Sequence, residues 1–182
     1  MKAKILLIAL IVAAVFIAGC VGQAPQPQFL YNLTKDGVLY EFNNNIYDSM
    51  NVPISDKNMI YEKLMMPDQL WMLYTKGSDE AIVAVAAADI TAKIQYYNSY
   101  SLSKIVRVGT YDLSNQSEQN VSASDLTGTL IELRGPDMVN ETAVFMSDGR
   151  IIVEGTNRTS LSMAADRLTL VLFEDTLNLT SS

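Results

Sequence analysis

Residues 70–97 read LWMLYTKGSDEAIVAVAAADITAKIQYY, and this stretch decides the fold. Leu70 to Thr75 is a nearly continuous apolar run of strand length, which is typical of a strand buried on both faces. After a Lys-Gly-Ser turn, Asp79 and Glu80 open a long helix that runs to about Tyr97, because acidic side chains oppose the helix dipole in a first turn. The stretch therefore predicts a sheet strand followed by a covering helix.

The predicted helix has one apolar stripe with i, i+4 spacing, formed by Ile82, Ala86, Ile90, Ile94 and Tyr97. Four of the five residues from 84 to 88 are alanine, which predicts a close approach of this helix to the sheet.

The flanking segments extend the same architecture. Strands are predicted at 38–42, 105–111, 128–134, 142–146 and 150–154, and Asp148-Gly149 supplies a hairpin turn between the last two. Helices are predicted at 56–65, capped by Ser55, and at 161–173, capped by Thr159 or Ser160, with a frayed polar end from Glu174. Together they predict an α+β two-layer sandwich, with a mixed sheet of about six strands and two long helices on one face.

The two sides of the polar loop 112–127 resemble each other. Gly37-Val-Leu-Tyr-Glu-Phe parallels Gly128-Thr-Leu-Ile-Glu-Leu, and each side contains a strand followed by an alanine-containing helix. This pattern favours a duplicated strand–helix unit whose halves, 29–111 and 128–182, share one sheet. Convergent patterning of strand–turn–helix units is the alternative.

The N-terminal twenty residues have the pattern of an export signal. Residues 1–4 are basic, residues 5–19 (ILLIALIVAAVFIAG) contain no charged or polar side chain, and Cys20 is the single cysteine. A membrane-spanning helix needs roughly 20 apolar residues, so this run is short for a permanent span, although an uncleaved anchor remains an alternative. Residues 20–28, which include two prolines and three glutamines, are predicted to form a tether to a single domain at 29–182.

Ile17-Ala18-Gly19-Cys20 resembles the lipobox of bacterial and archaeal lipoproteins. The resemblance implies removal of the signal peptide, residues 1–19, lipidation of Cys20, and attachment to the outer face of the membrane. Together with Gly135-Pro136-Asp137 and the Ala164-Ala165-Asp166 helix, the chain also resembles small lipoproteins of archaeal envelopes, a resemblance that implies no activity.

The charge of the chain restricts its partners. Removing Lys2 and Lys4 with the signal leaves eleven basic against twenty acidic residues, a net charge of −9. Such a domain repels phosphate backbones, so nucleic acid is not expected as a partner. A single cysteine excludes an intramolecular disulfide, and stability must come from a packed core.

Six Asn-x-Ser/Thr triplets suit an exported glycoprotein, while polar loops rich in these residues are the alternative. They begin at Asn32, Asn115, Asn120, Asn140, Asn157 and Asn178.

Candidate chemistry is sparse. The chain has no histidine, and Cys20 lies at the tether, so no catalytic residues, metal or cofactor are predicted. Two of Glu41, Glu132 and Glu154 approaching each other would suit a carboxylate-dependent hydrolase, but pairing with arginine is the alternative. Asp89 and Asp166 are predicted to be solvated or cap-side residues.

Tyr96 and Tyr100 lie off the apolar stripe and are predicted to form a small exposed patch for a partner. We therefore expect a non-enzymatic, lipid-anchored envelope protein that binds an envelope protein or glycan. The alternatives are a membrane-complex subunit held by an uncleaved N-terminal helix, or a carboxylate-dependent hydrolase.

Overall fold

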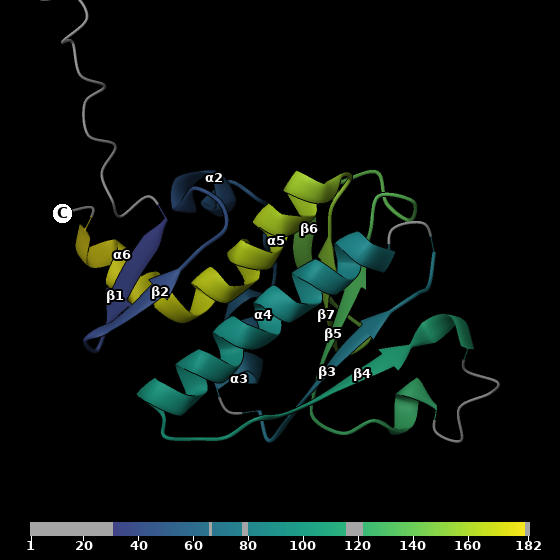
Figure 1. Ribbon diagram of the computed structural model, residues 1–182, viewed down its shortest axis with the longest axis horizontal. Coiled ribbons are helices and arrows are strands. Elements are labelled where there is room, and N and C mark those ends of the chain that lie inside the picture. The colour runs from purple at the N-terminus through teal and green to yellow at the C-terminus, as the bar shows by residue number, and fades with distance from the viewer. Residues whose placement is uncertain (1–30, 66, 78–79, 116–121, 181–182) are drawn as a thin grey trace, which may run out of the picture. The chain divides into compact units, whose positions relative to one another are not determined.

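A five-stranded sheet carries helices on one face, giving two layers (Figure 1). The computed structural model describes residues 31–180, apart from 66, 78–79 and 116–121. The strands lie in the order β4 (Arg107–Asp112), β3 (Gln69–Tyr74), β5 (Thr129–Arg134), β7 (Arg150–Glu154) and β6 (Ala143–Ser147). The first four are parallel, and β6 is antiparallel to β7. The predicted α+β two-layer sandwich is confirmed.

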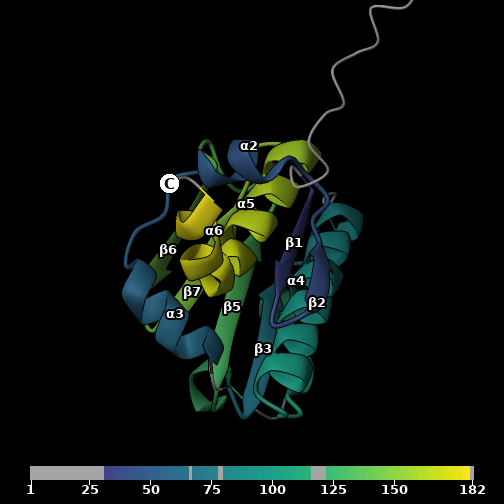
Figure 2. The same cartoon turned by 90° about the vertical axis from the view of Figure 1, so that its left-hand side faces the viewer.

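The two long helices lie side by side over this face of the sheet (Figures 1 and 2). They are α4 (Glu80–Ser101) and α5 (Arg158–Leu170). The shorter helix α2 (Ile46–Met50) packs on α5, and α3 (Lys57–Met65) packs against the 3-10 turn η4 (Val171–Phe173) that follows α5. The chain then continues as α6 (Glu174–Thr180), where the sequence predicts a frayed end.

The turn between β6 and β7 follows directly from its two residues. Asp148 has φ 48° and Gly149 has φ 76°, so both adopt the left-handed conformation that a tight two-residue hairpin requires. Asp and Gly tolerate this conformation better than other residues. The predicted hairpin is present, and the register pairs Ser147 with Arg150 across the turn.

Residues 38–42 do not join the main sheet as the duplicated-unit prediction requires. Strand β2 (Val38–Glu41) instead pairs with β1 (Asn32–Lys35) in a separate antiparallel sheet. Tyr40 of β2 packs its ring against Phe173, with centroids 4.5 Å apart, which fixes this hairpin on the helical layer. The strand–helix pairs β3–α4 and β7–α5 do place both long helices on one face.

Two helices begin at different residues from those predicted. Asn157 caps α5, because its side-chain oxygen accepts from the Ser160 N–H at 2.9 Å while the Ser160 hydroxyl accepts from the Asn157 N–H. The predicted caps at Thr159 and Ser160 are therefore wrong by two or three residues. Helix α3 begins at Lys57 rather than 56, because Asp56 has a left-handed φ of 54°.

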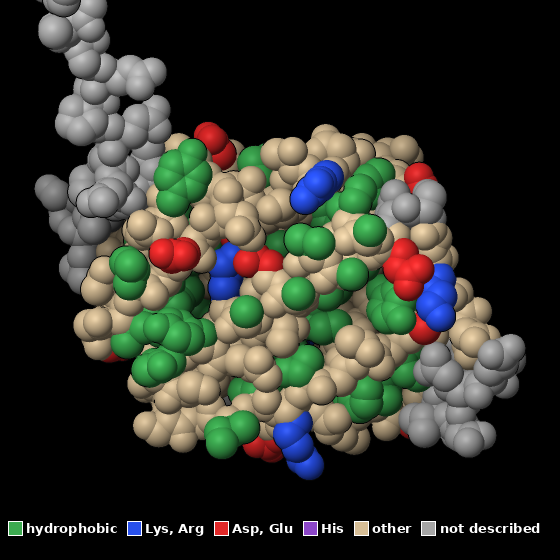
Figure 3. Space-filling model, viewed as in Figure 1, with side chains coloured by type: hydrophobic (Ala, Val, Ile, Leu, Met, Phe, Trp, Pro, Cys, Tyr) green, Lys and Arg blue, Asp and Glu red, His purple; other side chains and the backbone are tan. Residues whose placement is uncertain are grey.

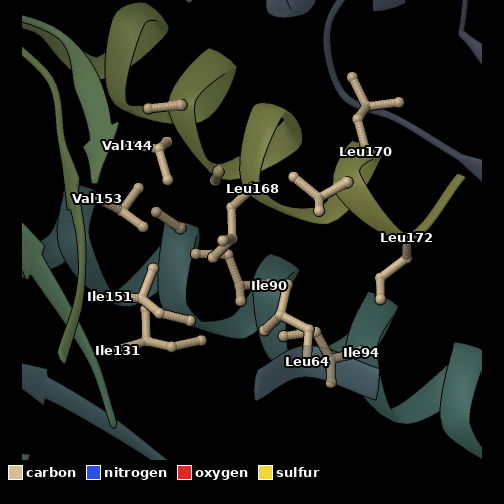
Figure 4. Packing of buried hydrophobic residues seen from close by; sticks show 14 of the residues in the cluster. Leu64, Ile90, Ile94, Ile131, Val144, Ile151, Val153, Leu168, Leu170 and Leu172 are labelled. Atoms are coloured by element: carbon tan, nitrogen blue, oxygen red, sulfur yellow. The ribbon is translucent and has the colours of Figure 1, made fainter. Parts of the chain in front are cut away.

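The core lies between the sheet and the helices (Figure 4). Side chains of α3, α4 and α5 point toward those of β5, β6 and β7 there. Each large apolar side chain that is buried contributes roughly 1.5–3 kcal/mol. Examples with no more than 2% exposure are Leu64 in α3, Ile90 and Ile94 in α4, Ile131 in β5, Ile151 in β7 and Leu168 in α5.

A buried ion cluster joins α4 to α5. Lys93 Nζ lies 2.7 Å from Asp166 Oδ1 and 2.5 Å from Asp89 Oδ2. Asp166 is fully buried, and its other oxygen accepts from the backbone and side-chain nitrogens of Asn44 at 2.8 and 2.7 Å. The prediction that Asp166 is solvated is therefore wrong, because its charge is compensated by partners remote in sequence.

Replacing Asp166 with alanine leaves the Lys93 ammonium largely buried with Asp89 as its remaining carboxylate. We expect Asp166→Ala to lower the free energy of unfolding by about 3–5 kcal/mol, measured by urea denaturation. Glu62→Gln, at an exposed acid of α3, is the control and should change stability by less than about 0.5 kcal/mol. A loss below about 1 kcal/mol for Asp166→Ala would show that the cluster does not stabilise the fold.

Candidate functional site

A pocket of about 350 Å³ lies between the N-terminal half of α4 and the sheet. Its sheet side is formed by side chains of β3, β4 and β5, and extends from the amino-terminal part of β4 to the carboxyl ends of β3 and β5. We call this the α4–sheet pocket. Its lining is mostly apolar: Met72, Val83, Ala84, Ala87, Ala88, Val108 and Leu133. Four residues add polar groups: Tyr74, Glu80, Thr91 and Thr110.

The pocket exists because small side chains face one another across it. Alanines 84, 87 and 88 line it from α4, and Val108 and Thr110 line it from the edge strand β4. The alanines were predicted to bring the helix close to the sheet, but in this half of α4 they leave a hollow. Figure 3 shows hydrophobic side chains at the surface along the side of α4 that faces β3 and β4.

Four lining residues are exposed, Glu80, Ala84 and Ala88 on α4 and Thr110 on β4, so the pocket is open to solvent along this side; we call its end at Glu80 the mouth. Glu80 is the first helical residue, is exposed, and lines the pocket together with the exposed Ala84. Nearby, Lys76 Nζ lies 3.2 Å from Asp112 Oδ2. This contact with Asp112 raises the pKa of Lys76, with smaller contributions from Tyr74 and Glu80. Glu80 is therefore the charged residue that lines the pocket, and the lysine that it influences is already paired with Asp112.

The opposite face of the sheet has a smaller apolar cluster at its β4 end. Leu73 and Tyr111 are buried there with Ala123 of the 3-10 turn η3 (Ala123–Asp125). The Trp71 indole donates to the Thr127 carbonyl at 3.1 Å and lies over Gly109, where a side chain would collide with the ring. The polar excursion after β4 thus covers part of this face.

The rest of that face carries a ladder of ion pairs on β5 and β7. The two Glu132 oxygens accept from Arg134 Nε at 2.8 Å and Arg150 Nη1 at 3.0 Å. Glu154 lies 3.8 Å from Arg134, while Glu41 lies in β2 of the separate sheet. The structure thus places Glu132 and Glu154 on neighbouring strands, both paired with arginine.

Burial raises the pKa of Glu154, and Glu141 raises it further, although Arg134 opposes the shift. The folded state therefore holds this proton more tightly than the unfolded chain, so stability falls as pH rises from about 4.5 through the folded pKa.

We expect Glu154→Gln to raise Tm at pH 7 by no more than about 2–4 °C and to lose this advantage near pH 4. Thermal melts across this pH range test it, and a lower Tm for Glu154→Gln at pH 7 would mean that the Arg134 contact outweighs burial.

The predicted modification sites fall in different environments. Cys20 and Asn120 lie outside the described residues. Asn32 begins β1, Asn115 ends the 3-10 turn η2 (Leu113–Asn115), and both are half-buried. Asn140 is exposed before β6, Asn157 is exposed at the cap of α5, and Asn178 lies within α6. Glycosylation of these residues stays a prediction.

Tyr96 and Tyr100 form an exposed pair at the end of α4. They are 40% and 61% exposed, with ring centroids 4.4 Å apart, and Tyr96 meets the edge of Tyr40 at 5.3 Å. Figure 3 shows hydrophobic side chains gathered where this end of α4 meets β2. Tyr97 is buried against Phe173. A partner for the exposed pair stays a prediction.

Within residues 31–180, excluding the gaps given above, no helix is long and apolar enough to cross a membrane. The same part of the chain contains no group of three Asp, Glu, Cys or His side chains placed to hold a metal ion. No protein-family model, curated protein or solved structure matches the chain. A functional assignment therefore depends on the geometry of the chain itself.

Proposed function

We propose that this protein is a non-enzymatic binding protein, attached by lipid on Cys20 to the outer face of the cell membrane, that takes its ligand in the α4–sheet pocket. The observation that carries the binding role is the apolar hollow of about 350 Å³ between α4 and three strands of the sheet. Ligand pockets in proteins have volumes of roughly 300–1,000 Å³ and combine apolar walls with a few polar groups.

The walls of the pocket suit binding better than chemistry. Acid–base or nucleophilic catalysis needs an acid or a nucleophile with a partner base held in place beside it. Here the polar groups are two threonines, Tyr74 and the exposed Glu80, among mostly apolar side chains. On the other face of the sheet, the two oxygens of Glu132 accept from Arg134 and Arg150, and the contact with Arg150 joins β5 to β7.

The location rests on the sequence Ile17-Ala18-Gly19-Cys20 and the apolar run before it. Lipid on Cys20 leaves at most about 40 Å of extended chain between the modified cysteine and the first described residue, Tyr31. The folded unit that begins there would thus be held near the bilayer surface. Binding an apolar ligand at that place is consistent with an accessory role in the envelope.

Intact mass tests the attachment. Protein isolated from membranes of a host that processes lipoproteins should lack residues 1–19 and carry lipid on Cys20, whereas Cys20→Ser should show no lipid adduct. A wild-type mass corresponding to the complete, unmodified chain would contradict lipid anchoring and support the alternative of an uncleaved N-terminal helix.

Filling the pocket tests the binding role. Ala87 is half-buried and faces the hollow, so Ala87→Leu should raise stability by about 0.5–2 kcal/mol as a cavity-filling change. The same change should weaken binding of the neutral fluorescent probe N-phenylnaphthylamine at least about tenfold, a difference of about 1.4 kcal/mol.

Ala81→Leu is the matched control, because Ala81 is exposed on the same helix and does not line the pocket. It should leave probe binding unchanged. If the wild-type protein does not bind the probe, or if Ala87→Leu binds it as tightly as wild type, the pocket is not a ligand site.

A further inference from the structure

We infer that the α4–sheet pocket selects amphiphiles with a positively charged end, such as an alkylammonium group, placing the apolar body in the hollow and the cation beside Glu80. This inference rests on the proposed binding role of the pocket and names the class of ligand. It follows from the separation of apolar and charged groups along the pocket.

The inner part of the pocket offers apolar contact. Met72 and Leu133 are buried with no more than 2% exposure, and Val108 and Ala87 are half-buried beside them. An aliphatic chain placed against these side chains gains roughly 25 cal/mol for each Å² of apolar surface removed from water. A charged group placed there would lose its hydration without a partner, so the charged end of a ligand lies at an exposed part of the pocket. Of the exposed lining residues, Glu80 at the mouth is the charged one.

The mouth carries a net negative charge. Among the lining residues in the described part of the chain, Glu80 is the charged one, and its side chain is exposed. Lys76, a lysine that interacts electrostatically with Glu80, is paired with Asp112 at 3.2 Å. An anionic ligand would meet the carboxylate of Glu80, whereas an ammonium group gains an ion pair with it.

The helix dipole of α4 does not reverse this preference. The positive end of a helix is equivalent to about half an elementary charge, which is less than the full charge of a carboxylate. The Glu80 N–H already donates to the Gly77 carbonyl at 3.3 Å, so this donor is occupied.

The charge of the whole chain acts in the same direction. The net charge is −7 for the sequence as written, and −9 once residues 1–19 are removed. A negative protein concentrates cations near its surface and repels anions, an effect that weakens as ionic strength rises. Long-range and local electrostatics therefore both favour a cationic end.

Competition against N-phenylnaphthylamine on the full-length protein tests the inference, using octylammonium and nonanoate, whose alkyl chains are of equal length. At neutral pH and low salt we expect octylammonium to displace the probe at a concentration about fivefold lower than nonanoate, as for an exposed ion pair. In Glu80→Gln the two ligands should compete within about twofold of each other. Glu62→Gln removes an exposed acid of α3 instead and should keep the wild-type preference.

The outcomes separate this inference from the function on which it rests. If the probe binds and both ligands displace it equally, or nonanoate does so more tightly, the pocket binds apolar groups but the cationic preference is wrong. A preference that persists unchanged in Glu80→Gln would also overturn the assignment to this carboxylate. Failure of the probe itself to bind would refute the binding role and the inference together.

Discussion

The structure depends on how α4 is held over the sheet. Its C-terminal half is fixed by large side chains such as Ile94 and Tyr97, and by the buried contact of Lys93 with Asp166. Its N-terminal half faces the sheet with alanines. Because a helix of 22 residues is a stiff rod about 33 Å long, fixing one half determines how far the other half stands from the strands. The α4–sheet pocket is the space that this constraint leaves unfilled.

The same constraint explains why the space beneath α5 is filled while the space beneath the N-terminal half of α4 is not. Beneath α5, side chains such as Leu168, Ile151 and Val153 point toward one another and fill the layer (Figure 4). Toward the edge strand β4, Val108 and Thr110 are too short to reach across to alanine. Small side chains on both sides leave room for a ligand. Glu80, at the mouth, adds a negatively charged side chain to one end of this apolar pocket.

Much of the architecture could be predicted because it depends on local patterns. The apolar run at 70–75 and the stripe that includes Ile90 identified β3 and α4, and Asp148-Gly149 identified the β6–β7 turn. Burial of Asp166 could not be read from its neighbours, because Lys93 lies 73 residues away. Strand β2 was assigned to the wrong sheet because pairing with β1 depends on residues 32–35, which have no strong strand pattern.

The pocket was not predicted for a related reason. A run of alanines is compatible with close packing or with a hollow, and the outcome depends on which side chains face it. Here these come from β3, β4 and β5, which are separated in sequence. The sequence feature that could have indicated the pocket is a pair of segments with small side chains. One is the alanine-rich run 84–88 in the helix, and the other is 108–110 in the strand that follows it. That feature requires knowing that β4 lies beneath α4.

The most direct test of a ligand site beneath α4 is methyl NMR of the protein titrated with octylammonium. The account predicts saturable shifts concentrated on the methyl groups of Ala87, Val108 and Leu133, with the methyl groups of Leu168 and Val153 unmoved. Shifts spread over the surface without saturation, or confined to methyl groups beneath α5, would contradict it.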